Sequence, residues 1–356
     1  MDVLTAALKS GPAQRRDDEF YKPRQQDYFD FGHDHKWSPA PFTQSTSLSN
    51  LAVNRKAIRL MSWNIDMLVP FGNERMTAAL QYLESLVASA PLDIAIVIFL
   101  QEMTPSDLDL IASSAWVQNR FNITDTDASS WLSPHYGTVT LIDTRLSVLS
   151  VFRVPFLSKF DRDGLFVDIA MSTPRTSSSF NETPKVLRLC NVHLESLVAD
   201  PPVRPHQLSA AAAYLHAPEV ACALLAGDLN AIEPFDRMLP SKNNLQDAYL
   251  TLGGKEDSEE GYTWGYQVPA PMKEKFGCSR MDKILFCGDV RVNSFVRIGA
   301  GVKVAEEKRE EVKKAGEEDW VSDHYGVTGD FELTADWSVN TGGGDGRVAK
   351  SKVSSL

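Results

Sequence analysis

The sequence predicts an α/β protein with two mixed β-sheets packed face to face and helices on the outside. Segments with helical periodicity alternate with short apolar runs, which is typical of the α/β class. Several apolar runs also follow one another without a helix between them, so antiparallel strand pairs are expected beside parallel ones. The chain has 356 residues, 43% hydrophobic and 23% charged, which fits a globular protein and excludes collagen-like, coiled-coil and fully disordered classes.

The first part of the chain predicts a strand, a helix and a second strand. Residues 58–63 are an apolar run of strand length, and residues 73–88 repeat apolar side chains at helical spacing. Residues 94–100 are fully apolar, which predicts a buried strand. Thr104 and Pro105 after this run are typical of a helix start.

The rest of the chain predicts more strands than helices. Four consecutive runs have the composition of strands, at residues 136–142, 146–155, 164–171 and 186–194. A helix is expected at residues 204–216, and the tract 304–319, rich in Glu and Lys, predicts a solvated helix or loop. The remaining strands are expected at residues 221–226, 280–286, 290–298 and 325–333.

One domain is expected between two polar ends. Residues 1–54 mix charge, Pro, Ser and scattered aromatics without periodicity, which predicts a disordered or loosely packed tail. Residues 337–356 contain a glycine run followed by basic residues, which predicts a flexible tail. No linker or repeat interrupts residues 55–336, so this stretch is expected to form a single domain.

The charge balance excludes attraction to a polyanion by the whole surface. The 36 basic and 47 acidic residues give a formal net charge of −11, so a local site must hold any nucleic acid or phosphate. No apolar run approaches the roughly 18 residues of a membrane helix, and the N-terminus is too polar for a secretory signal. We therefore expect an intracellular protein, nuclear or cytoplasmic, that is not secreted and has no membrane partner.

Six oxygen-bearing side chains stand in or beside the predicted strands. They are Asn64, Glu102, Asp228, Asn230, Asp282 and Asp323. Such groups are costly to bury without partners. Oxygen ligands without a thiolate suit Mg²⁺, a hard cation that also binds phosphate. The pattern therefore favours a magnesium site that acts on a phosphoester.

Six short motifs in a fixed order make the chain resemble the endonuclease/exonuclease/phosphatase superfamily. The motifs lie at residues 62–66, 100–102, 191–196, 227–230, 280–282 and 322–324. The resemblance covers residues 58–333 and implies a four-layer α/β sandwich with the site at the rim where the strands end. Within the superfamily the chain is most similar to the tyrosyl-DNA phosphodiesterase 2 branch, on residues 63–66, 74–76, 193–196, 262–264 and 281–286.

Three residues are candidates for the metal site. Glu102 is the only carboxylate beside its apolar strand and is the best candidate for a direct Mg²⁺ ligand, a role that the matching Glu has in the family. Asn64 can orient the metal or the phosphate, because an amide is both donor and acceptor. Asp323 would support the metal or a water molecule.

Five residues are candidates for catalysis. Asp228 and Asn230 project the same way from an extended loop, and the resemblance implies that Asp228 positions or deprotonates the attacking water while Asn230 binds the phosphate. His193 and His324 are the cationic candidates, because an imidazole with an ordinary pKa of about 6.5 can donate to a phosphate oxygen or leaving group. Asp282 would orient His324.

The resemblance also implies a substrate. Ser196 matches a serine that binds phosphate in the tyrosyl-DNA enzymes, and Trp264 offers a ring on which a terminal base could stack, worth about 1–3 kcal/mol. The expected reaction is Mg²⁺-dependent hydrolysis, with Mn²⁺ as a substitute, of the 5′-phosphotyrosyl bond between DNA ends and trapped protein, a step of DNA repair. The expected partners are single-stranded or frayed 5′ DNA ends with tyrosyl or peptide adducts, and we expect a monomer.

Two other functions stay open. The same chemistry would serve a nuclease, a deadenylase or a small-molecule phosphoesterase, and a binding module without activity would keep only the fold. Residues 231–233 are Ala-Ile-Glu where the tyrosyl-DNA enzymes have an Arg, and residues 67–70 lack the usual Gly, so the substrate is less certain than the chemistry. Trp264 taken alone is more typical of a core. Local positive charge is expected from Lys159, Arg162, Arg175 and Lys185.

Overall fold

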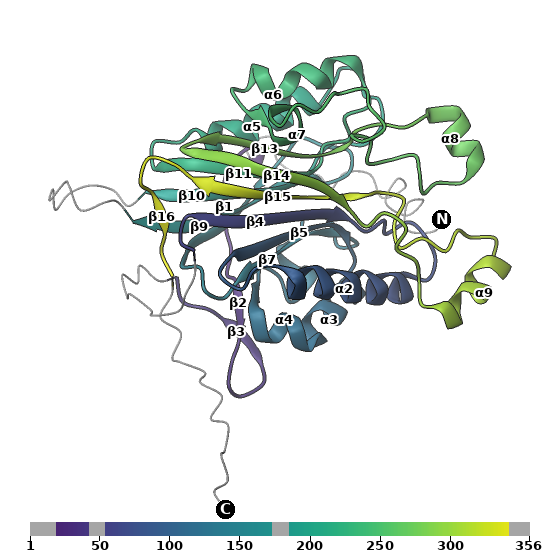
Figure 1. Cartoon of the computed structure of the whole chain (residues 1–356), viewed down its shortest axis with the longest axis horizontal. Helices are drawn as coiled ribbons and strands as arrows, with labels where there is room; N and C mark the ends of the chain where they lie inside the picture. Colours follow the sequence, from purple (N-terminus) through teal and green to yellow (C-terminus); the bar gives the residue numbers. More distant parts are fainter. Residues whose placement is uncertain (1–18, 43–53, 173–184, 342–356) are drawn as a thin grey trace, which may run out of the picture.

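The computed structural model describes residues 19–42, 54–172 and 185–341 of the chain. Within these ranges the chain forms two mixed eight-stranded β-sheets that pack face to face (Figure 1). The first sheet runs in order through β1 (Arg24–Gln25), β8 (Val148–Pro155), β9 (Asp163–Ser172), β10 (Val186–His193), β11 (Val220–Asp228), β13 (Asp282–Gly288) and β12 (Gln246–Asp247), and β16 (Ser338–Val339) pairs with β9. The second sheet runs through β14 (Val290–Ile298), β15 (Gly326–Leu333), β4 (Ala57–Asn64), β5 (Ala95–Met103), β7 (Gly137–Asp143), β6 (Phe121–Ile123), β2 (Phe29–Phe31) and β3 (Trp37–Pro39).

Each sheet contains a parallel pair of long, buried strands. These pairs are β4 with β5 and β10 with β11, whereas the other strand pairs in the described ranges are antiparallel. A helix connects the two strands of each pair, as parallel strands require: α2 (Gly72–Ser89) in the second sheet and α5 (Arg204–Leu215) in the first. The carboxyl ends of both strands in a pair therefore meet at one edge of the sheet.

Helices cover the outer face of each sheet (Figure 1). With α2 on the second sheet lie α3 (Pro105–Ser113) and α4 (Ala115–Arg120). Beside α5 on the first sheet lies α6 (Leu239–Lys242), whereas α7 (Ala248–Thr251) contacts β12 and β13 of the first sheet and β14 of the second. Two helices project beyond the sandwich in Figure 1, α8 (Ala270–Phe276) and α9 (Glu306–Lys314).

Alternating side chains fill the spaces between these layers. In β5, Phe99 faces the core between the sheets while its neighbour Ile98 packs under the helices of the second sheet. In β9, Val167 and Phe166 divide in the same way between the inner core and the core beneath α5. Strands with both faces buried read as continuous apolar runs, which is why the sequence shows them clearly. The observed layers confirm the predicted four-layer α/β sandwich.

The N-terminal segment differs from the predicted tail. Residues 24–39 contribute β1 to the first sheet and the hairpin β2–β3 to the second, so this part of the expected tail belongs to the fold. Tyr28 is buried in the core between the sheets. The reason for the error is that strands of two or three residues leave no periodicity to detect. Residues 1–18 and 43–53 of the predicted tail lie outside the described residues.

The predicted C-terminal tail also begins too early. Ser338 and Val339 form β16 on β9, and the Trp337 indole Nε1 donates to Asp289 Oδ2 at 2.9 Å. The glycine run and the basic residues after Thr341 lie outside the described residues, as does most of the polar stretch 172–185. Among the described residues no helix is both long and apolar enough to cross a bilayer.

Candidate active site

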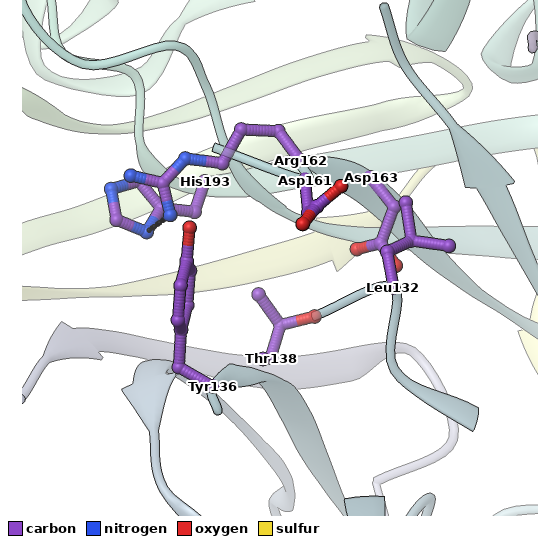
Figure 2. Close-up of a pocket in the computed structure, with 8 residues that line it drawn as sticks. Leu132, Tyr136, Thr138, Asp161, Arg162, Asp163 and His193 are labelled. Atoms are coloured by element: carbon purple, nitrogen blue, oxygen red, sulfur yellow. Dashed lines mark hydrogen bonds between the residues drawn. The ribbon is translucent and has the colours of Figure 1, made fainter. Parts of the chain in front are cut away.

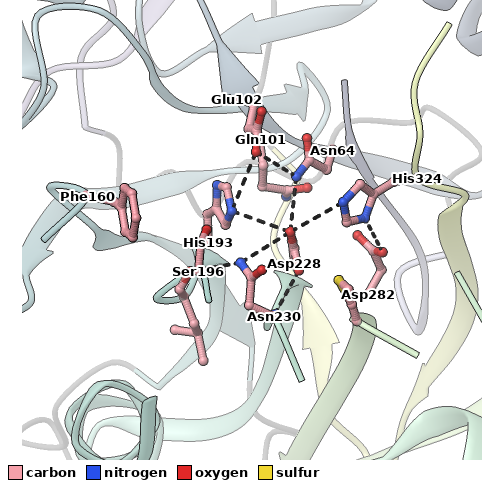
Figure 3. A network of polar contacts seen from close by, with 12 residues as sticks. Asn64, Gln101, Glu102, Phe160, His193, Ser196, Asp228, Asn230, Asp282 and His324 are labelled. Carbon is pink, nitrogen blue, oxygen red and sulfur yellow. Dashed lines mark hydrogen bonds and ion pairs between the residues drawn. The ribbon is translucent and has the colours of Figure 1, made fainter. Parts of the chain in front are cut away.

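The register of the first sheet places three predicted residues side by side. His193 ends β10 and pairs with Asp228 at the end of β11, and Asp228 pairs in turn with Asp282 at the start of β13. Neighbouring strands lie about 4.8 Å apart, so the three side chains reach one point. All three residues are buried, and Figure 3 shows His193 and Asp282 on either side of Asp228.

Asn64 and Glu102 are the residues of the second sheet that lie beside Asp228. Asn64 ends β4, and Glu102 lies in β5 where the pairing with β7 is irregular and its own φ is 60°. Such a bulge re-aims a side chain at the end of a strand. Asn64 Nδ2 donates to Glu102 Oε1 at 3.2 Å and to Asp228 Oδ2 at 3.1 Å. One amide therefore joins carboxylates from the two sheets (Figure 3).

A buried amide pair connects the sheets directly behind the site. Gln101 Nε2, from β5, donates to Asn191 Oδ1, from β10, at 2.8 Å. Asn191 Nδ2 donates in turn to the backbone oxygen of Val139 at 3.0 Å. Both amides are fully buried, so these hydrogen bonds have no competition from water.

The carboxylate of Asp228 is held in its ionised form. Its Oδ2 lies 3.4 Å from His193 Nε2 and 3.8 Å from His324 Nε2. Burial raises the pKa of this carboxyl, but the charge of His324 and the contact with His193 outweigh burial and hold the pKa well below its usual range. The backbone N–H of Asn230 also donates to Asp228 Oδ1 at 2.7 Å. Asp228 is therefore suited to orient a water molecule or to accept its proton.

His324 and Asp282 form the expected base-and-orienter pair. His324 Nδ1 lies 2.8 Å from Asp282 Oδ2, so its Nε2 points toward Asp228. Burial lowers the pKa of His324, but the charges of Asp282, Asp323 and Asp228 outweigh burial and raise it well above its usual range. Burial raises the pKa of Asp282 itself to about 6. His324 is thus a cation at neutral pH with one nitrogen free to face a substrate.

Trp264 does not have the role expected from the sequence. Its ring is 8% exposed, and its indole Nε1 donates to Asp323 Oδ2 at 2.7 Å. The backbone of Trp264 also bridges to His324. The expected stacking face is therefore largely covered, and Trp264 positions Asp323 instead.

Asn230 and Ser196 both make internal contacts at the rim. Asn230 Nδ2 donates to the backbone oxygen of Leu194 at 3.0 Å and lies 3.4 Å from Asp228 Oδ2. Ser196 Oγ accepts a hydrogen bond of 2.7 Å from Arg162 Nη2. The two side chains lie on the same side of the site as His193 (Figure 3).

Arg162 is a site residue that the sequence suggested only as a source of local positive charge. Its Nη1 lies 2.8 Å from His193 Nδ1, and its guanidinium lies over the rings of Tyr136 and Phe160 at 5.4 and 5.5 Å. Of the four cations proposed to supply local charge, Arg162 is the one shown at the site. Lys185 donates to the Pro218 backbone instead. Arg175 lies outside the described residues.

The position of Arg162 changes the expected role of His193. Burial and the adjacent Arg162 charge lower the pKa of His193, so the ring is neutral rather than cationic at neutral pH. Figure 2 shows His193, Arg162 and Tyr136 around a small cavity. The cavity measures about 10 Å³, which is room for about one water molecule. The cationic donor on this side is therefore Arg162.

An acid cluster at the mouth of the site fits a hard divalent cation. Asp66 follows β4, and burial together with the charges of Asp323 and Glu102 raises the pKa of Asp66 well above its usual value. Burial, followed by smaller contributions that include the charge of Glu102, also raises the pKa of Asp323. Carboxylates that repel one another in this way lose that repulsion when a cation lies between them. Asp66 was missed because no strand pattern marks the loop that carries it.

A second group of residues has metal-binding spacing. The ligand atoms of Asp228, Asp282 and His324 lie within 4.8 Å of one another and could hold a metal ion. In this group, however, Asp282 Oδ2 already accepts the hydrogen bond from His324 Nδ1. Glu102 and Asn64 are better placed to share a cation with a substrate, because the Glu102 side chain is 15% exposed.

Solved structures with this fold include TDP2 from two animals and the catalytic domain of human Nocturnin. TDP2 (tyrosyl-DNA phosphodiesterase 2) from D. rerio, in complex with a single-strand DNA product, matches with a TM-score of 0.56 and 19% identity over 78% of this chain and 99% of that one. Truncated TDP2 from Caenorhabditis elegans matches with a TM-score of 0.56 and 20% identity over 78% of this chain and 98% of that one. The human Nocturnin catalytic domain matches with a TM-score of 0.52 and 17% identity over 79% and 96%. At these identities the likeness concerns the fold.

Sequence comparison supplies the family. None of the curated protein sequences is similar enough to this chain to count as a match. The model of the Endonuclease/Exonuclease/phosphatase family matches residues 61–324, which include the strand ends that carry Asn64, Glu102, Asp228 and His324. The chain therefore belongs to the endonuclease/exonuclease/phosphatase family, whose members hydrolyse phosphodiesters or phosphate esters.

Proposed function

We propose that the chain is a Mg²⁺-dependent phosphodiesterase that hydrolyses the 5′-phosphotyrosyl bond between a DNA end and trapped protein. The observation that carries the proposal is the charge arrangement around Asp228. This carboxylate is ionised, His324 opposite it is protonated, and Asn64 ties it to Glu102 in the other sheet. A base and an acid that stand ready together at neutral pH suit hydrolysis of a phosphodiester.

The residues divide the reaction between them. Asp228 orients a water molecule and accepts its proton as the water oxygen bonds to phosphorus. His324 Nε2 donates a hydrogen bond to a phosphate oxygen, while Asp282 keeps its imidazole in place. The bond between phosphorus and the tyrosyl oxygen then breaks and releases a phenolate. With a pKa of about 10, this group needs less protonation than a sugar alkoxide.

Arg162 supports the binding of the phosphate. Residues 231–233 after Asn230 are Ala-Ile-Glu where the tyrosyl-DNA enzymes have an Arg, so the expected cation is absent from that stretch. Arg162 reaches the same side of the site from the loop before β9 and already contacts His193 and Ser196. A guanidinium can offer two parallel donors to a phosphate.

Helix α8 supports the binding of a single strand. Phe276 at its end is 59% exposed, and its ring centre lies 6.4 Å from that of Trp264, which contacts Asp323. Lys273 and Lys275 are exposed on the same helix. An exposed ring beside lysines is what single-stranded nucleic acid binds, by base stacking and phosphate contacts. Phe276 thereby takes the stacking role that the sequence assigned to Trp264.

Glu102 and Asn64 would hold the metal ion, with Asp323 and Asp66 beside them. When bound there, Mg²⁺ supplies positive charge that neutralises the phosphate and the departing oxygen. The acid cluster favours this binding, because burial and the charges of neighbouring carboxylates raise the pKa values of Asp66 and Asp323, and a cation would offset that repulsion.

The test is cleavage of a single-stranded oligonucleotide with a 5′-phosphotyrosyl end. The assay compares Mg²⁺, Mn²⁺ and chelator, and a matched oligonucleotide with a plain 5′ phosphate reports any general nuclease activity. We expect release of tyrosine with either ion and none with chelator. Asp228→Asn and His324→Ala should each lower kcat by roughly 10²- to 10⁴-fold, the usual contribution of general acid–base groups.

The outcomes separate the possible functions. Tyrosine release that depends on metal and on both residues supports the proposal. Shortening of the plain oligonucleotide at a similar rate would instead identify a nuclease. Turnover of any phosphoester that survives Asp228→Asn contradicts the proposed chemistry itself.

A second candidate is a phosphoesterase of the same family with another substrate. The stretch 231–233, Ala-Ile-Glu, favours it, because it lacks the cation that the tyrosyl-DNA enzymes carry there. Activity on poly(A) or on a small phosphate ester, without tyrosine release, would favour this candidate.

A further inference from the structure

Three loops meet beside Ser196, at the ends of β8, β10 and β11. Glu195, 1% exposed, joins two of them, because its side chain accepts hydrogen bonds from Ser158 Oγ and, at 2.9 Å, from the backbone N–H of Lys159. Gln207 from α5 forms a hydrogen bond with each loop. Its Nε2 donates to the Leu157 backbone oxygen at 3.0 Å, and its Oε1 accepts from the Glu195 backbone N–H at 2.8 Å. These two loops therefore form one continuous edge.

Arg204 connects the third loop to this edge. Its Nη1 donates to the backbone oxygen of Leu197 at 2.7 Å, and its Nη2 donates to Glu233 at 2.9 Å and to Asp236 at 2.8 Å. Arg204 is 2% exposed. Its charge is thus used inside the protein and is not presented to a ligand.

The tips of the three loops carry aliphatic side chains in solvent. Leu157 is 52% exposed, Leu197 65%, Val198 69% and Ile232 38%. We call these four residues the apolar rim. Exposed aliphatic residues scattered singly are ordinary, but several held together beside a reactive site indicate binding.

The apolar rim is continuous with the site. Leu197 follows Ser196 directly, and the backbone N–H of Ile232 donates to the backbone oxygen of Asn230 at 2.9 Å. In Figure 3, Ser196 and His193 lie on one side of Asp228, and His324 lies on the other. Helix α8 is linked to the His324 side through Trp264. The rim and the proposed strand-binding helix therefore flank the scissile phosphate on opposite sides.

The charges around the rim do not match a nucleic-acid backbone. Lys159 is exposed there, but so is Asp200, so the surface has no excess of positive charge to bind phosphates. The net charge of −11 also disfavours an anionic membrane as the occupant. An apolar group joined to the phosphate fits this surface better than a second length of DNA.

We propose that the apolar rim binds aliphatic side chains of the peptide attached to the scissile phosphate. The inference rests on the proposed function and names the part of the substrate that this function leaves open. It makes the chain selective among adducts: a phosphotyrosine flanked by Leu, Ile or Val is preferred over one flanked by polar residues.

Two oligonucleotides that differ only in their peptide provide the test. Both carry a 5′-phosphotyrosine within a short peptide, flanked by two leucines in one and by two serines in the other. We expect kcat/KM to be on the order of tenfold higher for the leucine peptide, the effect of covering one or two aliphatic groups. The double variant Leu197→Ser with Val198→Ser should bring the ratio close to one.

Two further variants make the result specific. Leu157→Ser removes the one rim side chain that lies on the loop after β8. It should also lower the ratio of kcat/KM between the two peptides, even if the double variant proves unstable. Leu92→Ser is the matched control, because Leu92 is 81% exposed but precedes β5, at the end away from the site. It should keep the wild-type ratio.

Each failure has its own signature. Efficient cleavage of both peptides at equal kcat/KM, or a ratio unchanged by all rim variants, overturns this inference and leaves the proposed function standing. No cleavage of either peptide or of a plain tyrosyl end overturns the proposed function, and this inference with it.

Discussion

The charge of His324 is set by three carboxylates, two of them from other strands. Asp282 comes from β13, Asp228 from β11 and Asp323 from the adjacent loop, and together they overcome the effect of burial on the His324 pKa. Of these, Asp282 contacts the ring most closely, at 2.8 Å. The imidazolium form is thus a property of the assembled sheet.

Asp282→Asn should shift the pH dependence of the reaction. A raised pKa means that His324 stays protonated at neutral pH and that the rate falls only as the pH rises through that value. Loss of the Asp282 charge lowers the pKa, so the alkaline fall in kcat should move to lower pH. A pH–rate profile of the variant checks this shift.

The control for this measurement is Asp289→Asn, which changes an acid just beyond the other end of β13 that bonds Trp337. It should leave the profile in place. An alkaline limb that stays at the wild-type pH in Asp282→Asn would show that the protonated form of His324 is not what the reaction requires.

Residues within strands were the ones the sequence could predict. Asn64, Glu102 and Asp228 stand at strand ends next to apolar runs, and His324 lies just before β15, so pattern and order identify them. Arg162 has no such mark, because it lies in the loop between β8 and β9, and only the folded position of that loop brings it to His193. The prediction for Trp264 failed for a similar reason, because its ring packs against Met281 and bonds Asp323, and both lie outside its own stretch of sequence.

At the scale of elements, the N-terminal strands connect both sheets at one edge. Gln26, next to β1, donates to the Thr124 backbone oxygen at 2.8 Å and accepts a 2.8 Å bond from Arg153 Nε. Arg153, 2% exposed, also pairs with Asp125 at 2.9 Å and with Asp163 at 3.1 Å. Asp163 follows Arg162 directly, so this segment supports the loop that carries the site cation.

Deletion of residues 1–31 should therefore destabilise the protein. The deletion uncovers core around Tyr28 and removes a hydrogen bond from a buried guanidinium, at a cost of about 2–4 kcal/mol. Calorimetry should show a fall in Tm of roughly 5 °C or more. Deletion of residues 1–18 alone is the comparison, and equal Tm values for both deletions would show that β1 and β2 contribute no stability.

Helix α8 makes a separate prediction about strand binding. Phe276→Ala should weaken binding of a single-stranded oligonucleotide by about tenfold, because one stacked base is worth about 1–3 kcal/mol. Fluorescence anisotropy measures this change. Leu252→Ala, at an exposed apolar residue in the loop after α7, serves as the control. Unchanged affinity in Phe276→Ala would place the strand elsewhere.

At the scale of the whole molecule, the two sheets bring acids together that the chain keeps far apart. Asp66 and Glu102 come from the second sheet's loops and strands, and Asp228 comes from the first. Their mutual repulsion is a cost of folding that a bound cation would remove. The layered fold was predictable because its strands are continuous apolar runs, whereas the short edge strands and the N-terminal hairpin carry too few residues for a pattern. The intracellular location stays a prediction.

Mg²⁺ should raise the thermal stability of the full chain. A ligand present at a hundred times its Kd stabilises the folded state by about 2.7 kcal/mol, so Tm should rise by several degrees and chelator should reverse the change. Because the pKa values of Asp66 and Asp323 are raised, protons compete with the ion at a higher pH than they would at ordinary carboxyls. The rise in Tm caused by Mg²⁺ should therefore shrink as the pH is lowered. Differential scanning fluorimetry with Glu102→Gln as the comparison measures it. A wild-type shift that Glu102→Gln retains would place the ion at another site.

The hydrogen bond between Gln101 and Asn191 has a consequence for how this architecture diversifies. The bond fixes the alignment of the two sheets from the interior, one residue behind Glu102 and two before His193. The rise per residue in a strand is about 3.3 Å, so a slip of a single position would separate every pair of groups that performs the chemistry. Because this fixing point lies in the interior, the loops in front can change in length and composition without misplacing the reactive groups. New specificities can therefore arise by replacement of loops while the catalytic apparatus is inherited unchanged.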